Sequence, residues 1–355
     1  MTSYKKEYKV IGLMSGTSFD GLDIALCHFI LEKNQWSFQI EKAETIAYSI
    51  EWIKTLQDAE KPNSNYQEIS RKYGLYIGEE VNLFIKRFAI TGIDLIASHG
   101  HTLFHEPAKK LSFQAGDGDS IFNKTSITTV SNFRQQDVLL GGQGAPLVPI
   151  GDLLLFKKHT VCVNLGGFAN ISLKANNTIT AWDICPVNYI LNNLTLKIGL
   201  EYDDKGKIAA LNTVDEELLQ QLNDLSYYNS KPPKSLSREW VFTEVWPLLN
   251  NSSYSIEQKI ATIAEHAAIQ IAQSIPKNST ALFTGGGTFN THLMNRIKLH
   301  NDSLEITVPE KKIIEFKEAL IFAFLGTLRI RDENNVLASV TGAIKDHSSG
   351  EIFSD

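Results

Sequence analysis

The sequence lacks features that are typical of several classes of protein. Cysteine occurs only three times in 355 residues, at Cys27, Cys162 and Cys185, and no CxxC pair is present. This scatter excludes a zinc ribbon and a thioredoxin-like redox motif. Cys27 and Cys162 lie in apolar, strand-like runs, where a free thiol behaves as a small hydrophobic side chain.

Concentrated positive charge and long apolar runs are also missing. The formal net charge is -6 and no block of Lys and Arg occurs, which argues against a nucleic-acid or anionic-membrane partner. The longest dense apolar run, residues 319–325, is far shorter than the roughly 20 residues of a membrane-spanning helix. Residues 1–7 lack the apolar core of a signal peptide, so we expect a cytoplasmic protein.

What is present is a repeated alternation of strands and helices. In the first half, an apolar strand, a Gly-bearing turn and a second strand occupy residues 10–26, and a third strand follows at 36–48. The same order returns at residues 161–182, and helical periodicity marks residues 66–88, 256–275 and 311–331. We therefore expect two α/β domains with a cleft between them, residues 1–131 with a C-terminal tail of about 338–355, and residues 132–337.

Three Gly-rich turns follow predicted strands, at residues 15–18, 164–167 and 284–287. Small residues let the backbone approach a ligand closely and aim N–H groups at phosphate oxygens. None of the turns matches GxxxxGK[ST] or GxGxxG, so backbone amides and a metal ion would hold the phosphates. Ordinary strand-end turns remain the alternative at this point.

Asp183 ends a predicted strand just before a predicted helix. Phosphoryl transfer needs little beyond the orientation and deprotonation of the attacking oxygen, and one carboxylate at the edge of a site suffices as that base. The alternative is that Asp183 caps the helix that begins near Pro186.

Two further clusters have polar side chains suited to a site. His99, His101 and His105 would suit a metallohydrolase, or the histidines could hydrogen-bond a sugar. Arg134 could clamp a carboxylate, or form a surface ion pair with Asp137.

Taken together, these stretches resemble the anhydro-N-acetylmuramic acid kinases of the actin–hexokinase ATPase superfamily. The similarity extends over nearly the whole chain, and its most specific parts are residues 12–23 and 141–149. The matching stretches are 12–23 (GLMSGTSFDGLD), 98–102 (SHGHT), 133–137 (FRQQD), 141–149 (GGQGAPLVP), 164–167 (NLGG), 284–287 (TGGG), 317–325 (KEALIFAFL) and 340–343 (VTGA).

The resemblance implies two ribonuclease-H-like domains of the actin and hexokinase type, with ATP, Mg²⁺ and a sugar in the cleft. Water would open the 1,6-anhydro ring while O6 takes the γ-phosphoryl group, and Asp183 would act as the base. His99, Arg134, Asn188 and Glu318 would contact the substrate. The implied nucleotide and phosphate residues are Ser15, Gly16, Thr17, Ser18, Asp20, Gly21, Asn164, Gly166, Gly167, Gly285 and Gly286, with Asp20 also near Mg²⁺, directly or through water.

The chain departs from the family pattern in two places. Many relatives have Asp-Thr-Gly-Pro-Gly-Asn where this chain has residues 183–188 (DICPVN), so Cys185 and Val187 replace two glycines. His101 stands where glutamine is more usual. Either change could alter which sugar is accepted. The sequence also leaves open whether the protein is a homodimer, what residues 201–251 do, and the alternative of a nucleotide-binding or assembly protein without sugar chemistry.

Overall fold

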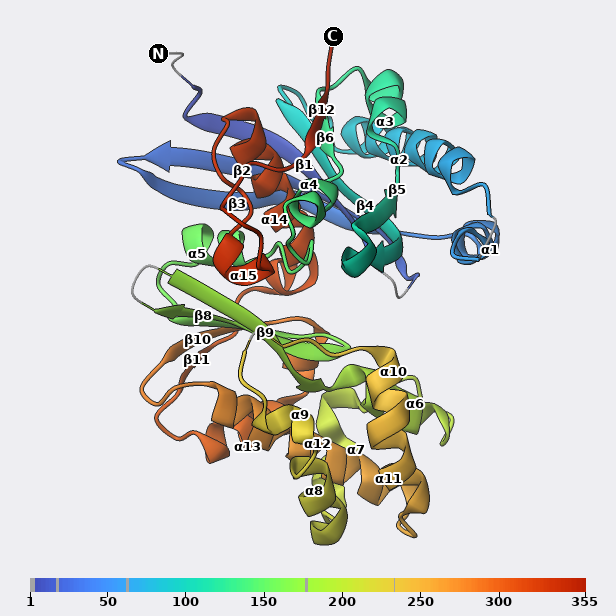
Figure 1. The fold of residues 1–355 in the computed structure, drawn as a ribbon, viewed down its shortest axis with the longest axis vertical. Helices are drawn as coiled ribbons and strands as arrows, with labels where there is room; N and C mark the ends of the chain where they lie inside the picture. Colours follow the sequence, from blue (N-terminus) through green and yellow to red (C-terminus); the bar gives the residue numbers. More distant parts are fainter. Residues whose placement is uncertain (1–3, 17–18, 62–63, 176–177, 233) are drawn as a thin grey trace. The chain divides into compact units, whose positions relative to one another are not determined.

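The computed structural model describes residues 4–16, 19–61, 64–175, 178–232 and 234–355 (Figure 1). The chain forms two compact units, which we call unit 1 (Met1–Leu155 with Phe316–Asp355) and unit 2 (Phe156–Glu315). Residues 132–155 and 316–337, which the sequence pattern placed in the second domain, therefore pack with unit 1. The reason is that α5 (Pro149–Leu155) contacts β3 (Gln35–Ala47), and α14 (Lys311–Ile330) packs on β1 (Glu7–Ser15) in its later part, at Ala319.

Unit 1 is built on a mixed sheet whose strands follow the order β12-β6-β4-β1-β2-β3, with β5 paired to β4. β1, β2 and β3 form an antiparallel meander, β4 runs parallel to β1, and β6 runs parallel to β4. The strands are β1 (Glu7–Ser15), β2 (Gly21–Glu32), β3 (Gln35–Ala47), β4 (Leu95–Glu106), β5 (Leu111–Ala115), β6 (Thr129–Ser131) and β12 (Glu351–Phe353).

Helices cover both faces of this sheet. On one face, α2 (Tyr66–Arg87) buries Tyr73, Ile77 and Val81 at four-residue steps against the strands, in the span that the periodicity predicts. On the other face, α14 (Lys311–Ile330) comes so close to β1 that a Cβ on Gly12 would lie 2.0 Å from the Ala319 carbonyl oxygen. The other helices are α1 (Ile50–Ala59), α3 (Gly118–Thr125), α4 (Gln135–Leu139), α5 (Pro149–Leu155) and α15 (Ala338–Thr341).

The sheet of unit 2 follows the order β11-β10-β7-β8-β9. β7, β8 and β9 form an antiparallel meander, and β10 and β11 continue parallel to β7. Both units thus share one topology, an antiparallel meander whose first strand is extended by parallel strands, and this confirms the expected ribonuclease-H-like α/β fold. The strands are β7 (Val161–Leu165), β8 (Phe168–Ala175), β9 (Thr178–Pro186), β10 (Thr280–Thr284) and β11 (Glu305–Thr307).

The central helix of unit 2 is α12 (Ile256–Ser274). Ser255 and Gln258 form a reciprocal capping box at its start, and Ile260, Ile263 and Ile271 lie in the core. Residues 201–251, where the sequence signals were weak, form short helices and a π-helical turn (Val241–Val245). The remaining helices are α6 (Asn188–Leu196), α7 (Lys207–Leu211), α8 (Glu216–Asn223), α9 (Ser226–Asn229), α10 (Arg238–Trp240), α11 (Trp246–Asn251) and α13 (Thr291–His300).

The two units are joined within α14. Phe316 leaves helical geometry there, with φ -114° and ψ 18°, at the point where the chain passes from unit 2 to unit 1. Across the described residues, no helix is both long and apolar enough to cross a membrane.

Candidate active site

Asp183 lies on β9 in unit 2, and a distant segment of the same unit holds it. Its Oδ2 accepts a hydrogen bond from the Leu236 N–H at 2.9 Å, and its own N–H donates to the Lys234 carbonyl at 3.2 Å. The Tyr227 hydroxyl donates to its carbonyl oxygen at 2.5 Å. These three contacts come from residues 227–236, a region in which the sequence showed no functional signal.

The environment of Asp183 favours the protonated form of its carboxyl group. Burial raises its pKa above the usual value, and the Leu236 N–H lowers it by a smaller amount. Such a shift brings a carboxylate closer to the range in which general bases work. The helix-capping alternative is wrong, because α6 begins at Asn188 with Val187 as its N-cap and without a capping side chain.

The turn between β7 and β8 consists of Gly166 and Gly167, and its carbonyls are held by the start of α6. The Gly167 carbonyl accepts the N–H groups of Val187 at 2.8 Å and Tyr189 at 3.0 Å, and the Gly166 carbonyl accepts that of Asn188 at 3.3 Å. The N–H groups at the start of α6 are therefore already hydrogen-bonded within the protein.

The third Gly-rich turn meets the second in space. Gly285 has φ +83° and ψ 158°, and a Cβ there would lie 2.6 Å from the Asn164 Oδ1 and 2.8 Å from the Leu165 carbonyl. Only glycine fits such a position without strain. The structure thus brings together Asn164, Gly166 and Gly285, three of the residues proposed for nucleotide binding.

Beside this junction, unit 2 contains a cavity of about 560 Å³, a size typical of small-molecule sites. Gly286 and Gly287 form part of its wall, and Tyr202 and Phe289 supply aromatic surface. Asn188, which the resemblance placed at the sugar, also lines this cavity, and its Nδ2 donates to the Leu165 carbonyl at 3.1 Å. The aromatic pair carried no recognisable sequence signal.

In unit 1, the β1–β2 hairpin carries the first Gly-rich turn. Asp20 is exposed at this turn, and a Cβ on Gly21 would lie 2.4 Å from the Ile46 carbonyl. Gly16 accepts the Phe19 N–H at 3.4 Å, whereas Thr17 and Ser18 lie outside the described residues.

Ser15 lies just before this turn, and its side chain takes part in a buried polar chain. The Ser15 hydroxyl lies 2.7 Å from the Tyr48 hydroxyl and 3.0 Å from the His101 Nδ1, and Tyr48 in turn contacts the Tyr73 hydroxyl. Ser15 is almost fully buried, so its hydroxyl is committed to the core.

His99 and Arg134 are in direct contact in unit 1. The Arg134 Nε donates to the His99 Nε2 at 3.0 Å, and the His99 Nδ1–H donates to the Gly100 carbonyl at 2.8 Å. Burial and the guanidinium hold the pKa of His99 well below its usual value, so the ring is neutral and its tautomer is set by these two bonds.

Arg134 and Glu318 influence each other's charge. Burial lowers the pKa of Arg134 to about 10, and Glu318 opposes this shift. Glu318 is an exposed residue, yet its carboxyl lies beside buried neighbours and desolvation raises its pKa, which Arg134 and Lys317 lower by smaller amounts.

The histidine-rich stretch does not form a metal centre. The His101 Nδ1 contacts Ser15, the His105 Nδ1 contacts the Ser112 hydroxyl at 2.9 Å, and the His99 Nε2 accepts from Arg134. Among residues that the structure describes, no group of three His, Cys, Asp or Glu side chains is placed to hold a metal ion. The metallohydrolase alternative is not favoured.

The chain is similar to known proteins over nearly its whole length. Residues 8–355 match the family model described as anhydro-N-acetylmuramic acid kinase. Proteins of that name from Sulfurimonas denitrificans and Mannheimia succiniciproducens are each 33% identical, with 97% and 98% of this chain and 98% and 99% of theirs covered. A solved ROK family glucokinase from Streptomyces griseus in complex with glucose and AMPPNP is 10% identical, with a TM-score of 0.40 over 89% of this chain and 98% of that one. The chain belongs to the anhydro-N-acetylmuramic acid kinase family.

Proposed function

We propose that the protein converts 1,6-anhydro-N-acetylmuramic acid, water and ATP into N-acetylmuramic acid 6-phosphate and ADP, as part of cell-wall recycling. Family membership makes it an ATP-dependent phosphotransferase. The observation that carries the residue-level proposal is Asp183, a desolvated carboxylate with a raised pKa whose geometry is set by the Leu236 N–H.

In the proposed reaction Asp183 takes a proton from the attacking water. The water oxygen bonds to C1 of the sugar, the bond between C1 and O6 breaks, and O6 accepts the γ-phosphoryl group. The Leu236 N–H holds one carboxylate oxygen, which leaves the other free to accept the proton. A fixed orientation of this kind lowers the entropic cost of the step.

For the nucleotide, the proposal assigns a role to the Gly-rich turns of each unit, taken separately. The cavity beside Gly286 would receive the adenosine part, with Tyr202 and Phe289 as apolar surface. Gly166 and Gly167 would approach the phosphates, and so would the backbone near Gly16. The Ser15 hydroxyl would position the first turn through its contacts with Tyr48 and His101.

The proposal places Mg²⁺ at Asp20, beside the first turn. Asp20 is an exposed carboxylate, and Mg²⁺ characteristically takes one or two carboxylates together with water and substrate phosphates. Asp20 would hold the ion directly or through water, and the ion would neutralise charge on the phosphates.

For the sugar, the proposal assigns binding to His99, Arg134 and Glu318. The muramic acid lactyl group carries a carboxylate, which a guanidinium binds well. The neutral His99 ring and the carboxyl of Glu318 would hydrogen-bond the polar substituents of the sugar.

The test is to incubate the protein with ATP, Mg²⁺ and the anhydro sugar in H₂¹⁸O and to analyse the products by mass spectrometry. We expect the 6-phosphate with one ¹⁸O at C1. Nucleotide binding without any turnover of this sugar would overturn the proposed activity and revive the assembly-protein alternative. Light scattering on the same sample would separate a monomer from the homodimer, and fractionation of cells would test the proposed cytoplasmic location.

A further inference from the structure

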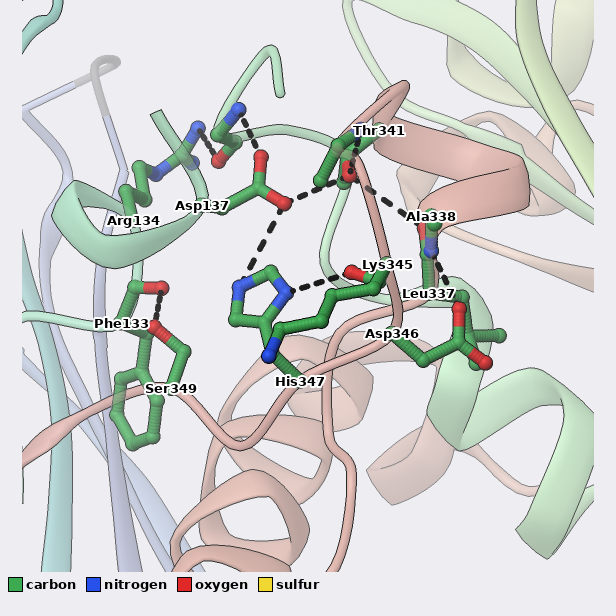
Figure 2. Close-up of polar contacts among 12 residues, drawn as sticks. Phe133, Arg134, Asp137, Leu337, Ala338, Thr341, Lys345, Asp346, His347 and Ser349 are labelled. Atoms are coloured by element: carbon green, nitrogen blue, oxygen red, sulfur yellow. Dashed lines mark hydrogen bonds and ion pairs between the residues drawn. The ribbon is translucent and has the colours of Figure 1, made fainter. Parts of the chain in front are cut away.

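A buried carboxylate in unit 1 joins two parts of the chain that are far apart in sequence. Asp137 of α4 is 0% exposed, and its two oxygens accept from different segments. Oδ2 accepts the Gly144 N–H at 2.6 Å, and Oδ1 accepts the Thr341 hydroxyl at 2.7 Å (Figure 2). The His347 Nε2 lies 3.6 Å from the same Oδ1. We call Asp137, Gly144, Thr341 and His347 the Asp137 network.

The loop after α4 folds closely around this carboxylate. Gly142 approaches so tightly that a Cβ there would lie 2.2 Å from the Asp137 Oδ2, and Gly144 has φ +68°. Thr341 holds the loop a second time, because its carbonyl accepts the Gln143 N–H at 2.8 Å. The position of Gly144 therefore depends on Asp137 and on the C-terminal segment together.

Gly144 is in turn the residue that orients Arg134. Its carbonyl accepts from the Arg134 Nη1 at 3.3 Å, while the Arg134 Nε donates to the His99 Nε2. A continuous series of hydrogen bonds thus runs from Thr341 through Asp137 and Gly144 to two of the side chains proposed to contact the sugar.

We propose that Asp137 is a positioning residue of the sugar site, and that the Thr341 hydroxyl holds it in place. This inference rests on the proposed function. A buried carboxylate keeps its geometry only while donors satisfy both of its oxygens. Loss of the Thr341 hydroxyl would let the Asp137 carboxylate rotate toward His347 or away from Gly144. The Gly144 carbonyl, which accepts from the Arg134 guanidinium, would then move as well. At metal sites, loss of a partner that orients a ligand changes affinity or activity about 10- to 100-fold, and we expect the lower end of that scale here.

The variant to make is Thr341→Val, which removes the hydroxyl with little change in shape and is milder than a change at Asp137 itself. We expect the KM for the anhydro sugar to rise about tenfold, with a smaller change in kcat and an unchanged KM for ATP. Thr341→Ser restores a hydroxyl and should recover most of the affinity. The matched control is Thr327→Val, because Thr327 is also fully buried in unit 1 and bonds the carbonyl four residues before it, as Thr341 does with Leu337, whereas the Thr341 hydroxyl also contacts Asp137.

A second readout does not depend on turnover. In ¹⁵N-histidine spectra, the His99 Nε2 signal, assigned with a His99→Gln variant, reports whether this nitrogen still accepts from Arg134. We expect it to shift in Thr341→Val and to keep its position in Thr327→Val. If wild-type protein does not turn over the sugar, the proposed function fails, whereas this spectrum still tests the Asp137 network.

The inference is overturned if Thr341→Val behaves like Thr327→Val in both the sugar KM and the His99 spectrum while wild-type protein is active. It is also overturned if Thr341→Val raises the KM for ATP as much as the KM for the sugar. The second outcome would make Thr341 a general stabilising residue.

Discussion

The first hairpins of the two units occupy the same place in the same topology but are built differently. In unit 1 the strand before the turn ends in Ser15, whose hydroxyl belongs to a buried chain of polar side chains with Tyr48 and His101. In unit 2 the corresponding strand ends in Leu165, and backbone groups hold the turn, with the Gly167 carbonyl accepting from the start of α6.

This difference shows how one topology can serve two purposes. In unit 2 the hairpin turn has room for side chains, because a Cβ on Gly166 or Gly167 would come no closer than 3.4 Å to another atom, and the crowded glycine is Gly285 of the neighbouring turn. In unit 1 the crowded glycine belongs to the hairpin itself, because a Cβ on Gly21 would lie 2.4 Å from the Ile46 carbonyl oxygen, while the neighbouring Asp20 stays exposed. Unit 2 also carries Asp183 on the third strand of its meander, so we expect the chemical step to depend mainly on unit 2.

The largest expected effect tests that assignment. Asp183→Asn keeps the shape of the side chain but removes the proton acceptor, so kcat should fall about 10²- to 10⁴-fold. Nucleotide affinity, measured by calorimetry, should stay unchanged. Asp224→Asn, at an exposed carboxylate of the same unit, is the matched control. An Asp183→Asn variant that keeps its activity would show that Asp183 is not the base.

The next effect concerns the glycine requirement of unit 2. Gly285→Ala places a methyl group against Asn164 and Leu165 at a backbone conformation that suits only glycine, so the free energy of unfolding should fall by roughly 3 kcal/mol. Gly286→Ala meets no atom within 4 Å and should change stability by less than about 1 kcal/mol. Urea denaturation of both variants measures the contrast, and equal losses would show that crowding at Gly285 is unimportant.

A buried histidine makes the stability of unit 1 dependent on pH. Burial lowers the pKa of His101 to about 4, from about 6.5 in the unfolded chain. Below pH 6.5, His101 therefore binds a proton in the unfolded state but not in the folded state. The folded state should lose about 3 kcal/mol as the pH falls from 6.5 to about 4.

His101→Gln introduces the residue more usual in the family and should remove this part of the pH dependence. Denaturation curves between pH 4 and 8 measure it. The matched control is His266→Gln in unit 2, because burial lowers the pKa of His266 to about 3 and its loss should flatten the curve in a similar way. An unchanged slope in His101→Gln would show that His101 is already protonated in the folded state.

The smallest effect concerns the polar chain beneath the first hairpin. Ser15→Ala leaves Tyr48 and His101 without one hydrogen-bond partner, which should cost about 1–2 kcal/mol of folding free energy. Ser172→Ala, at a buried serine in the meander of unit 2, is the comparison. A loss no greater than that of Ser172→Ala would mean that the hydroxyl chain contributes little to the hairpin.

Local patterns predicted much of this architecture. The apolar positions of α2 and α12 recur at helical spacing. The strand–turn–strand order of both meanders is visible because apolar runs are separated by turns rich in small residues at 15–18 and 164–167. The Gly285 turn was also visible as a run of glycines after a strand. Those features depend only on neighbours along the chain.

Contacts between distant segments were not predictable in the same way. The periodicity of α14 runs on without a break, so nothing in the sequence shows that Phe316 marks the passage between units. The helix start at Asn188, which excludes Asp183 as a cap, and the burial of Asp137 against Thr341 likewise became visible only in the structure.

Local spacing and motifs of fixed order are enough to predict the two α/β repeats, the family and the residue types of the candidate site. The groups that those residues contact depend on the folded chain. Asp183 is held by Leu236, Ser15 by Tyr48 and His101, and Arg134 by Gly144. The physical reason is that the pKa and orientation of a side chain depend on burial and hydrogen-bond partners, and folding brings those partners from remote positions in the chain.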